Sequence, residues 1–124
     1  MLLKIDMTSE VPIYRQIRDG VVLGVAGGRL SAGEPLPTVR QLAGDIGVNP
    51  MTVNKAYALL KKEGLIVVDR RRGARIAVPP GTNERFGPGF DRRAALLISE
   101  ARIRGASKRE ISEHVSELID GIYG

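Results

Sequence analysis

Residues 36–64 read LPTVRQLAGDIGVNPMTVNKAYALLKKEG and contain two amphipathic segments joined by a short turn. In the first segment, apolar residues recur at i, i+3, i+4 and i+7, which is the spacing of a helix with one buried face. They are Val39, Leu42, Ala43 and Ile46. Thr38 and Gln41 have the spacing of a capping box, and Gly47 can adopt the left-handed conformation that ends a helix. The segment therefore predicts a short helix between Thr38 and Gly47.

The second segment begins with a strong helix-start signal. Asn49 is a preferred N-cap residue, and Pro50 suits the first helical position. The buried stripe consists of Val53, Ala56, Tyr57 and Leu60. Gly64 marks the end of this longer helix. Two such helices with a tight turn between them have the geometry of a DNA-binding helix-turn-helix, and a purely structural helical hairpin is the alternative for this segment alone.

The residues after Gly64 predict a β-hairpin with a basic tip. Residues 65–68 and 75–78 are two runs rich in β-branched side chains. The sequence Asp69-Arg70-Arg71-Arg72-Gly73 lies near the tip of this hairpin. A hairpin directly after the second helix is the order of parts in a winged helix-turn-helix. The predicted fold class is therefore mainly α with a small β-hairpin (α+β).

Length and composition support one domain with a small appendage. A chain of 124 residues with 43% hydrophobic residues can build a core. An aromatic content of 4% without Trp argues against stacking platforms for single-stranded nucleic acid. The absence of Cys excludes disulfides, zinc fingers and thiol catalysis. Neither a signal-peptide pattern nor a long apolar run is present, so we expect a soluble, cytoplasmic protein with no membrane partner.

The excess positive charge is confined to the first part of the chain. Residues 1–80 contain 12 Lys or Arg against 7 Asp or Glu, whereas residues 81–124 contain 7 of each. The net charge of +5 therefore lies with the helix-turn-helix and the hairpin. Positive charge in that place favours a contact with phosphates.

A further helix is predicted over residues 12–28. Ile13, Ile17 and Val21 form its buried line, and residues 21–26 are apolar nearly all round, which predicts burial on more than one side. Four glycines also fall along one stripe, and they indicate a closely approaching element, for which a partner subunit is one candidate; fraying of the helix end is the alternative for the last two. The four glycines are Gly20, Gly24, Gly27 and Gly28. The loop that follows has room for a very short strand near Leu36.

These segments together resemble the DNA-binding domain of the GntR family of bacterial transcription regulators. The resemblance covers residues 10–78, and it rests on the strings Gly-Arg-Leu…Gly-Glu…Leu-Pro-x-x-Arg-x-Leu-Ala, Gly-Val-Asn-Pro-Met-Thr-Val and Glu-Gly-Leu-Ile. Asn-Pro-Met-Thr-Val followed by a short C-terminal region is similar to the YtrA subfamily. The resemblance implies a winged helix-turn-helix regulator that binds double-stranded DNA as a homodimer.

The hairpin tip departs from the pattern of that family. The family wing usually carries Gly-x-Gly, and Arg71 stands at the first of these glycines. A non-glycine residue tolerates positive φ poorly. The sequence therefore leaves open the tip geometry and the identity of the arginine that enters a DNA groove.

Residues 79–90, PPGTNERFGPGF, are predicted to be a linker between a DNA-binding domain, residues 1–78, and a tail, residues 91–124. The tail has two amphipathic segments separated by Gly105, and Ser107 with Glu110 has the spacing of a capping box. So small a helical hairpin cannot bury both apolar stripes alone. We expect it to form the homodimer, with packing on the winged domain as the alternative. The expected dimer contacts are Leu97, Ile98, Ala101, Ile111, Val115, Leu118, Ile119 and Ile122.

Residues at the start of the second helix are candidates for reading base edges, because the N-terminal part of a recognition helix enters the major groove. They are Asn49, Met51, Thr52 and Asn54. Asn can form two hydrogen bonds with adenine, and a Thr methyl group can contact the methyl group of thymine. Capping is the alternative role of Asn49 and Thr52, and it can coexist with a phosphate contact. Lys55 is a candidate for a phosphate or base contact.

Arg40 matches the arginine that the GntR family uses against DNA from its second helix, and a solvent-exposed helix charge is the alternative. The wing arginines are candidates for DNA contact because they follow the reading helix directly, although a charged run can also be a solvated turn. The remaining DNA-binding candidates are Thr38, Arg70, Arg71, Arg72 and Gly73.

The sequence offers little for catalysis. His114 is the single histidine, and no phosphate-binding glycine loop, nucleophile elbow or carboxylate pair is evident. We therefore expect neither an enzyme nor a metal or cofactor site. The sequence predicts a sequence-specific transcription regulator, a dimeric repressor of an inverted-repeat operator. A protein-interaction module or a low-specificity architectural DNA binder is the alternative, and nothing identifies an effector.

Overall fold

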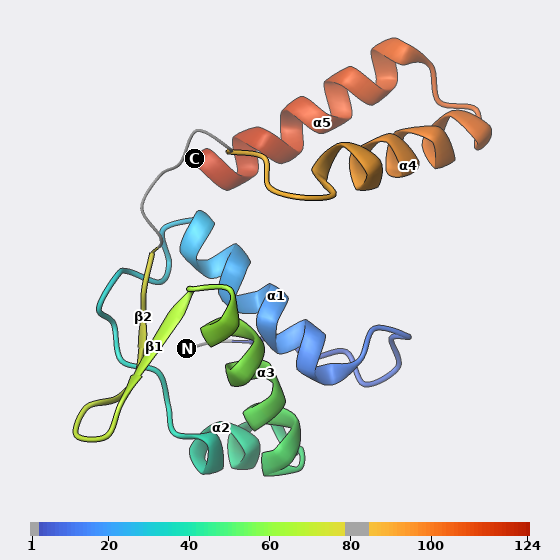
Figure 1. Ribbon diagram of the computed structural model, residues 1–124. Coiled ribbons are helices and arrows are strands. Elements are labelled where there is room, and N and C mark those ends of the chain that lie inside the picture. Colours follow the sequence, from blue (N-terminus) through green and yellow to red (C-terminus); the bar gives the residue numbers. More distant parts are fainter. Residues whose placement is uncertain (1–2, 79–84) are drawn as a thin grey trace. The chain divides into compact units, whose positions relative to one another are not determined.

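A computed structural model describes residues 3–78 and 85–124 of the chain. The chain divides into two compact units, Met1–Pro79 and Pro80–Gly124. The elements of the first unit are α1 (Ile13–Ala26), α2 (Val39–Ile46), α3 (Pro50–Lys62), β1 (Ile66–Asp69) and β2 (Gly73–Ile76). Figure 1 shows the three helices beside the two-stranded hairpin. The predicted fold class, mainly α with a small β-hairpin, is confirmed.

The capping signals of α2 and α3 act as the sequence predicts. The backbone N–H of Gln41 donates to Thr38 Oγ1 at 3.1 Å, and the backbone N–H of Thr38 donates to Gln41 Oε1 at 2.9 Å. Gly47 has a φ of 73° in the left-handed region. Asn49 Oδ1 accepts from the backbone N–H of Met51 at 2.8 Å. Each cap satisfies a backbone donor that the first turn of a helix leaves without a partner. The turn between the two helices is therefore specified locally.

The core of this unit lies where α3 meets the other elements. α3 packs against α1, α2 and β1. The side chains that are fully buried come from α1, α3 and the two strands, and each contributes about 1.5–3 kcal/mol by leaving water. They are Ile17, Val21, Val53, Leu60, Ile66 and Ile76. The predicted stripe of α3 is buried along its whole length.

The hairpin carries a third, very short strand. β1 and β2 are antiparallel, with Ile66 opposite Ile76 and Asp69 opposite Gly73. The loop before α2 joins the outer edge of β2, because the backbone N–H of Leu36 donates to the Ala74 carbonyl at 2.9 Å. The predicted short strand near Leu36 is present as an isolated bridge.

The predicted strand limits were shifted. β1 begins one residue later than expected, and β2 begins two residues earlier, at Gly73. The three-residue tip is short enough for Asp69 and Gly73 to pair, so the ladder starts directly at the tip. β-branched residues mark a strand, but the turn fixes its register.

α1 buries one face, and the expectation of burial on several sides was wrong. Ile17 and Val21 are inaccessible to solvent, whereas Leu23 is 54% exposed. The close approach that the glycines indicated comes from within the unit. A Cβ at Gly24 would lie 2.7 Å from Leu30 Cδ1, and a Cβ at Gly20 would lie 2.5 Å from Leu3 Cδ2. Two leucines therefore occupy the space that these glycines leave.

A charged contact joins α1 to the C-terminal end of α3. Arg18 Nε donates to Glu63 Oε1 at 3.0 Å, and an Arg18 terminal nitrogen lies 2.5 Å from Glu63 Oε2. Asp19 accepts a further hydrogen bond from Arg18 at 2.9 Å. The hydrogen bonds from Arg18 hold the pKa of the Glu63 carboxyl below its usual value. The two-point geometry fixes the orientation of both side chains.

The second unit contains α4 (Phe90–Ile103) and α5 (Lys108–Tyr123), which lie side by side (Figure 1). The predicted capping box is present, because the backbone N–H of Glu110 donates to Ser107 Oγ at 3.1 Å and Glu110 Oε1 accepts from Ser107 N at 2.9 Å. Gly105, with a φ of 100°, lies in the turn between the helices. Among the described residues, no helix is long and apolar enough to cross a membrane.

Two glycine variants test the packing of α1. Gly24→Ala is expected to lower the free energy of unfolding, because Leu30 is buried and overpacking costs about 1–3 kcal/mol against a helix-propensity gain of about 1 kcal/mol. Gly44→Ala is the matched control, since a Cβ there meets open space. It should raise stability by about 1 kcal/mol. Denaturant unfolding of both variants measures the difference, and stabilisation by both would contradict the packing described.

Acid unfolding tests the contact between Arg18 and Glu63. The pKa of Glu63 is lower in the folded than in the unfolded state. Its contribution to stability is therefore fully present above its unfolded pKa and is lost as the pH falls through the folded pKa. Glu63→Gln should be less stable than the native chain at pH 7, and the difference should shrink steadily as the pH falls below about 4. A stability difference that is independent of pH would rule out this role.

Candidate nucleic-acid interface

A groove joins the start of α2, the outer face of α3 and the hairpin. It has a volume of about 490 Å³. Its lining includes four predicted DNA-binding residues from three separate elements, namely Thr38, Asn54, Arg72 and Gly73. Thr38 and Gly73 are 35 residues apart in the sequence, and the packing of the hairpin and of the segment before α2 against α3 brings the four residues together. The groove is therefore the structural centre of the candidate surface.

The outer face of α3 presents the predicted base-reading residues. Met51 is 77% exposed, and Asn54 and Lys55 are exposed as well. Thr52 is half-buried at the edge of the core stripe. Asn49 uses Oδ1 for the helix cap, which leaves its Nδ2 protons as donors for an external group. Capping by Asn49 is thus observed, and it leaves the amide free for a second contact.

The start of α2 supplies two further donors. Thr38 Oγ1 accepts from Gln41 N, and its own hydroxyl proton remains to be donated. Arg40 is exposed on α2, next to the half-buried Val39. Backbone groups at a helix N-terminus carry partial positive charge, which adds to that of Arg40. This end of α2 therefore suits an anion.

The hairpin tip accommodates Arg71 without positive φ. Asp69 Oδ1 accepts from the backbone N–H of Arg71 at 2.7 Å and from that of Arg72 at 3.3 Å. Among the described residues, positive φ occurs only at glycines, and Gly73 adopts it here with a φ of 72°. The side chain of Asp69 thus organises the tip, and a glycine at position 71 is not required. Arg72 lines the groove, whereas Arg70 and Arg71 lie outside its lining.

The positive charge of this surface is largely uncompensated. Within the described residues, Arg18 is the only cation of the first unit that forms a salt bridge. Arg40, Lys55 and the arginines of residues 70–72 are all exposed. Cations without a carboxylate partner can neutralise phosphates and release counterions. The electrostatics of the surface therefore fit a polyanion.

Tyr57 joins the core to the candidate site. Its hydroxyl donates to the Pro37 carbonyl at 2.7 Å, and burial raises the pKa of the phenol to about 12. The contact fixes the segment before α2 against α3 and holds Thr38 at the groove. Sequence reasoning placed Tyr57 in the core stripe without a second role. No sequence pattern pairs its hydroxyl with a carbonyl twenty residues away.

Sequence reasoning also missed two positions on the groove wall. Ala58 and Lys61 line the groove together with Asn54. They follow Asn54 at i+4 and i+7, so the helical period that identified the buried stripe could have identified them. The side chain of Lys61 is exposed and borders the groove.

Lys55 contacts a residue that the sequence did not single out. Its ammonium nitrogen lies 4.1 Å from the centroid of the Tyr14 ring in the first turn of α1. This distance is that of a cation–π contact. The first turn of α1 therefore lies beside the reading face of α3.

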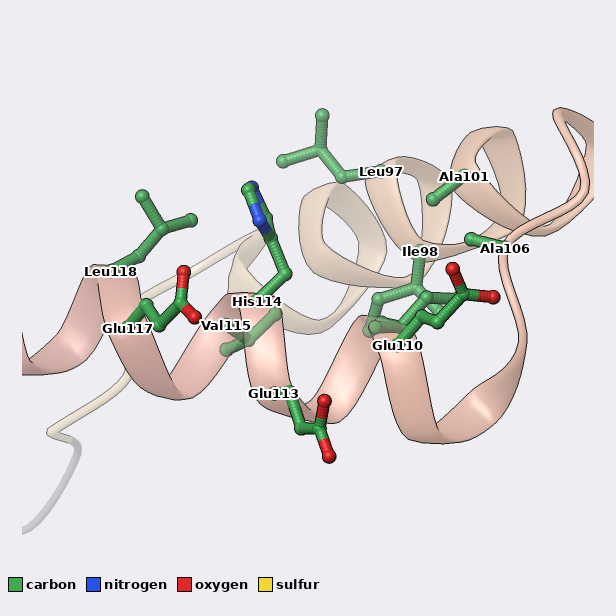
Figure 2. Close-up of a pocket in the computed structure, with 11 residues that line it drawn as sticks. Leu97, Ile98, Ala101, Ala106, Glu110, Glu113, His114, Val115, Glu117 and Leu118 are labelled. Atoms are coloured by element: carbon green, nitrogen blue, oxygen red, sulfur yellow. The ribbon is translucent and has the colours of Figure 1, made fainter.

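The second unit has an apolar groove of its own, between α4 and α5. Figure 2 shows Leu97, His114 and Leu118 extending toward the same side of the helix pair. The groove has a volume of about 630 Å³. The predicted dimer residues that line it are Leu97, Ile98, Ala101, Ile111, Val115 and Leu118. The other two, Ile119 and Ile122, lie outside the lining and are 48% and 42% exposed. No described residue of α4 or α5 is buried.

Among residues 3–78 and 85–124, no cluster of His, Cys, Asp or Glu side chains could hold a metal ion.

Comparison with known proteins identifies the family. Residues 13–76 match the group described as bacterial regulatory proteins, gntR family. The chain is also 34% identical to the transcriptional repressor YtrA of Bacillus subtilis, over 99% of this chain and 96% of that protein. The chain belongs to the gntR family. The match to YtrA over nearly its full length places it in the YtrA-like subfamily, and the matched relatives are named as transcription regulators.

Solved structures of similar sequence share the architecture. A transcriptional antiterminator from Listeria monocytogenes is 32% identical and superimposes with a TM-score of 0.82, over 100% of this chain and 95% of that one. The DNA-binding domain of AraR, solved in complex with an operator, is 25% identical and has a TM-score of 0.53. That match covers 62% of this chain and 95% of the AraR domain. The predicted family and subfamily are both confirmed.

Proposed function

We propose that this gntR-family protein is a transcription repressor that binds double-stranded DNA as a homodimer, at an operator made of two inverted half-sites. The observation that carries the proposal is the groove where Thr38, Asn54 and Arg72 meet. It combines the exposed face of a helix-turn-helix with a basic wing, and the cations around it lack carboxylate partners among the described residues. The AraR domain, which shares the fold, was solved with an operator.

α3 is the element proposed to enter the major groove. Met51, Thr52 and Asn54 lie in its first two turns, where a recognition helix contacts base edges. Asn54 offers an amide that can pair with adenine through two hydrogen bonds, and Met51 offers an exposed apolar surface to a thymine methyl group. Sequence preference should therefore depend on this short segment.

Phosphate contacts are proposed around the edge of the same surface. Arg40 and the N-terminus of α2 would bind phosphates of one DNA strand, while the wing arginines would bind phosphates elsewhere on the DNA backbone. The hydroxyl of Thr38 and the free amide protons of Asn49 are suitable neutral donors. Such contacts fix the position of the protein on the duplex and contribute affinity without reading sequence.

The tail, residues 91–124, is proposed to be the dimerisation region, joined by a linker, residues 79–90, to the DNA-binding domain, residues 1–78. Part of that linker, residues 79–84, lies outside the described residues. The tail exposes large apolar side chains along both helices, including Leu97 at 67% and Leu118 at 57%. Burying apolar area contributes about 25 cal/mol per Å², so a second copy could stabilise this surface. The tail also has no net charge to attract DNA.

Repression is proposed from the likeness to YtrA of Bacillus subtilis, which is named a repressor. A dimer with two reading helices would occupy half-sites about one helical turn apart, or a multiple of it. Two linked contacts raise affinity well beyond that of one domain. Occupation of a promoter by such a dimer would block transcription directly.

Substitutions on α3 and on the wing should act differently. Asn54→Ala should weaken binding to the selected operator by about 1–3 kcal/mol and relax the preference for particular base pairs. Arg72→Ala should weaken operator and random duplex alike and reduce the salt slope of log K by about one. The operator would first be selected from random duplex DNA, and affinities would be measured over a salt series.

Arg104→Ala is the matched control for the loss of a charge, since this exposed arginine lies in the tail. It should change neither selectivity nor the salt slope. Equal losses of selectivity in Asn54→Ala and Arg72→Ala would contradict the assigned division of roles. Operator binding that is indifferent to Arg72→Ala would favour a protein-interaction role for the wing.

Leu118→Glu should convert the dimer to a monomer, because it places a charge in the proposed contact, where an unpaired buried charge costs several kcal/mol. Ser116→Glu is the matched control, since it adds the same charge to the exposed surface of α5 outside the groove. Sedimentation equilibrium would measure the mass of each variant. A dimeric Leu118→Glu, or a native chain that is monomeric, would refute dimerisation through the tail.

A further inference from the structure

The contact between Lys55 and Tyr14 connects the reading helix to α1. The Lys55 ammonium lies over the face of the Tyr14 ring, 4.1 Å from its centroid. Tyr14 is half-buried and packs against the hydrophobic core, whereas Lys55 is exposed. The ring is thus held by the core, and the ammonium rests on its outer face.

The chemistry of this contact leaves the charge of Lys55 available. An aromatic face attracts a cation through the quadrupole of the ring, without neutralising it as a carboxylate would. Within the described residues, Lys55 forms no salt bridge. An ammonium has three donors, and those turned away from the ring remain free for an acceptor. Lys55 therefore combines a fixed position with an unpaired charge.

A fixed position matters for a lysine because its flexible stem has large rotamer freedom, which binding to a phosphate would otherwise remove. A side chain already held near its bound position loses less freedom on binding. Tyr14 can supply this preorganisation from the first turn of α1, which lies outside the helix-turn-helix and the wing. The ring acts through Lys55 and changes no charge itself.

We propose that Tyr14 is a positioning residue for DNA binding, which holds the ammonium of Lys55 toward a backbone phosphate and extends the nucleic-acid interface from α3 to the first turn of α1. This inference rests on the proposed function. It assigns Lys55 to the phosphate contacts and not to the base readers, because a lysine binds a phosphate as a compact point charge.

The test compares four variants of the full chain on the selected operator and on random duplex, over a salt series. Lys55→Met removes the charge and should reduce the salt slope by about one on both DNAs. Tyr14→Leu keeps the charge but removes the ring, so it should lower affinity about two- to fivefold with the slope unchanged. Tyr14→Phe keeps the ring face and should bind as the native chain does.

The double variant Tyr14→Leu with Lys55→Met identifies the coupling. If Tyr14 acts through Lys55, removing the ring should cost no further affinity once the lysine is absent. A purely structural role of Tyr14 would give the same loss in both backgrounds. Thermal unfolding of every variant accompanies the binding measurements. If Tyr14→Leu lowers the melting temperature, pentafluorophenylalanine at position 14 serves instead, since it reverses the ring quadrupole while keeping the shape.

Three results would overturn the inference. They are equal losses from Tyr14→Leu and Tyr14→Phe, an undiminished loss from Tyr14→Leu in the Lys55→Met background, and full affinity of the variant with the reversed quadrupole. Each of these leaves the proposed function intact if Arg72→Ala still weakens binding. Failure of the native chain to bind any duplex would instead remove the proposed function itself.

Discussion

The burial of one stripe of α3 is the constraint on which the rest of the winged unit depends. Val53, Ala56 and Leu60 are inaccessible to solvent, and they place α3 against α1, α2 and β1 at once. A helix has one rotational setting in which this stripe is buried. That setting turns Met51 and Asn54 outward together. The core therefore decides which side chains the helix can offer to DNA, and a change in packing would also rotate the reading face.

Polar contacts at the edge of this core convert packing into site geometry. The Tyr57 hydroxyl binds the Pro37 carbonyl, and Thr38 caps α2 in the next position. The pair of Arg18 and Glu63 fixes the other end of α3 to α1. The Tyr57–Pro37 and Arg18–Glu63 contacts each join segments far apart in sequence, whereas the Thr38 cap acts locally. The geometry of the candidate DNA-binding surface thus depends on a few directional hydrogen bonds in addition to the apolar packing of the core.

Local features of the sequence predicted most of the helical structure. Capping residues such as Thr38 and Asn49, and the glycine at position 47, act within a few residues of chain, so their signals can be read without tertiary contacts. The start of β2 was misplaced because register depends on the turn, and Asp69 shapes that turn through its side chain. The fold class and the family were therefore accessible from sequence, whereas strand limits were less so.

The groove and the contact between Tyr14 and Lys55 could not be predicted from the sequence as the helices could. The lining of the groove joins residues from position 36 to position 74, and which of them meet depends on how the hairpin packs on α3. Tyr14 lies outside the buried line predicted for its helix, so the sequence did not single it out. A cation–π contact between residues 41 positions apart has no sequence signature. Long-range geometry was the missing information, even though each of the participating elements had been predicted.

The glycine stripe of α1 and the apolar stripes of α4 and α5 were two candidate surfaces for contact with a second chain, and the structure accounts for only the first within one chain. In α1, Leu3 and Leu30 occupy the space left by Gly20 and Gly24, so these glycines need no second copy of the chain to account for them. In α4 and α5, no described residue is buried, although both helices have well-formed apolar stripes. Helices of this length are marginal in water without tertiary packing. The exposed apolar surface that lacks a packing partner therefore lies in the tail. This favours the tail over α1 as the place where two chains meet.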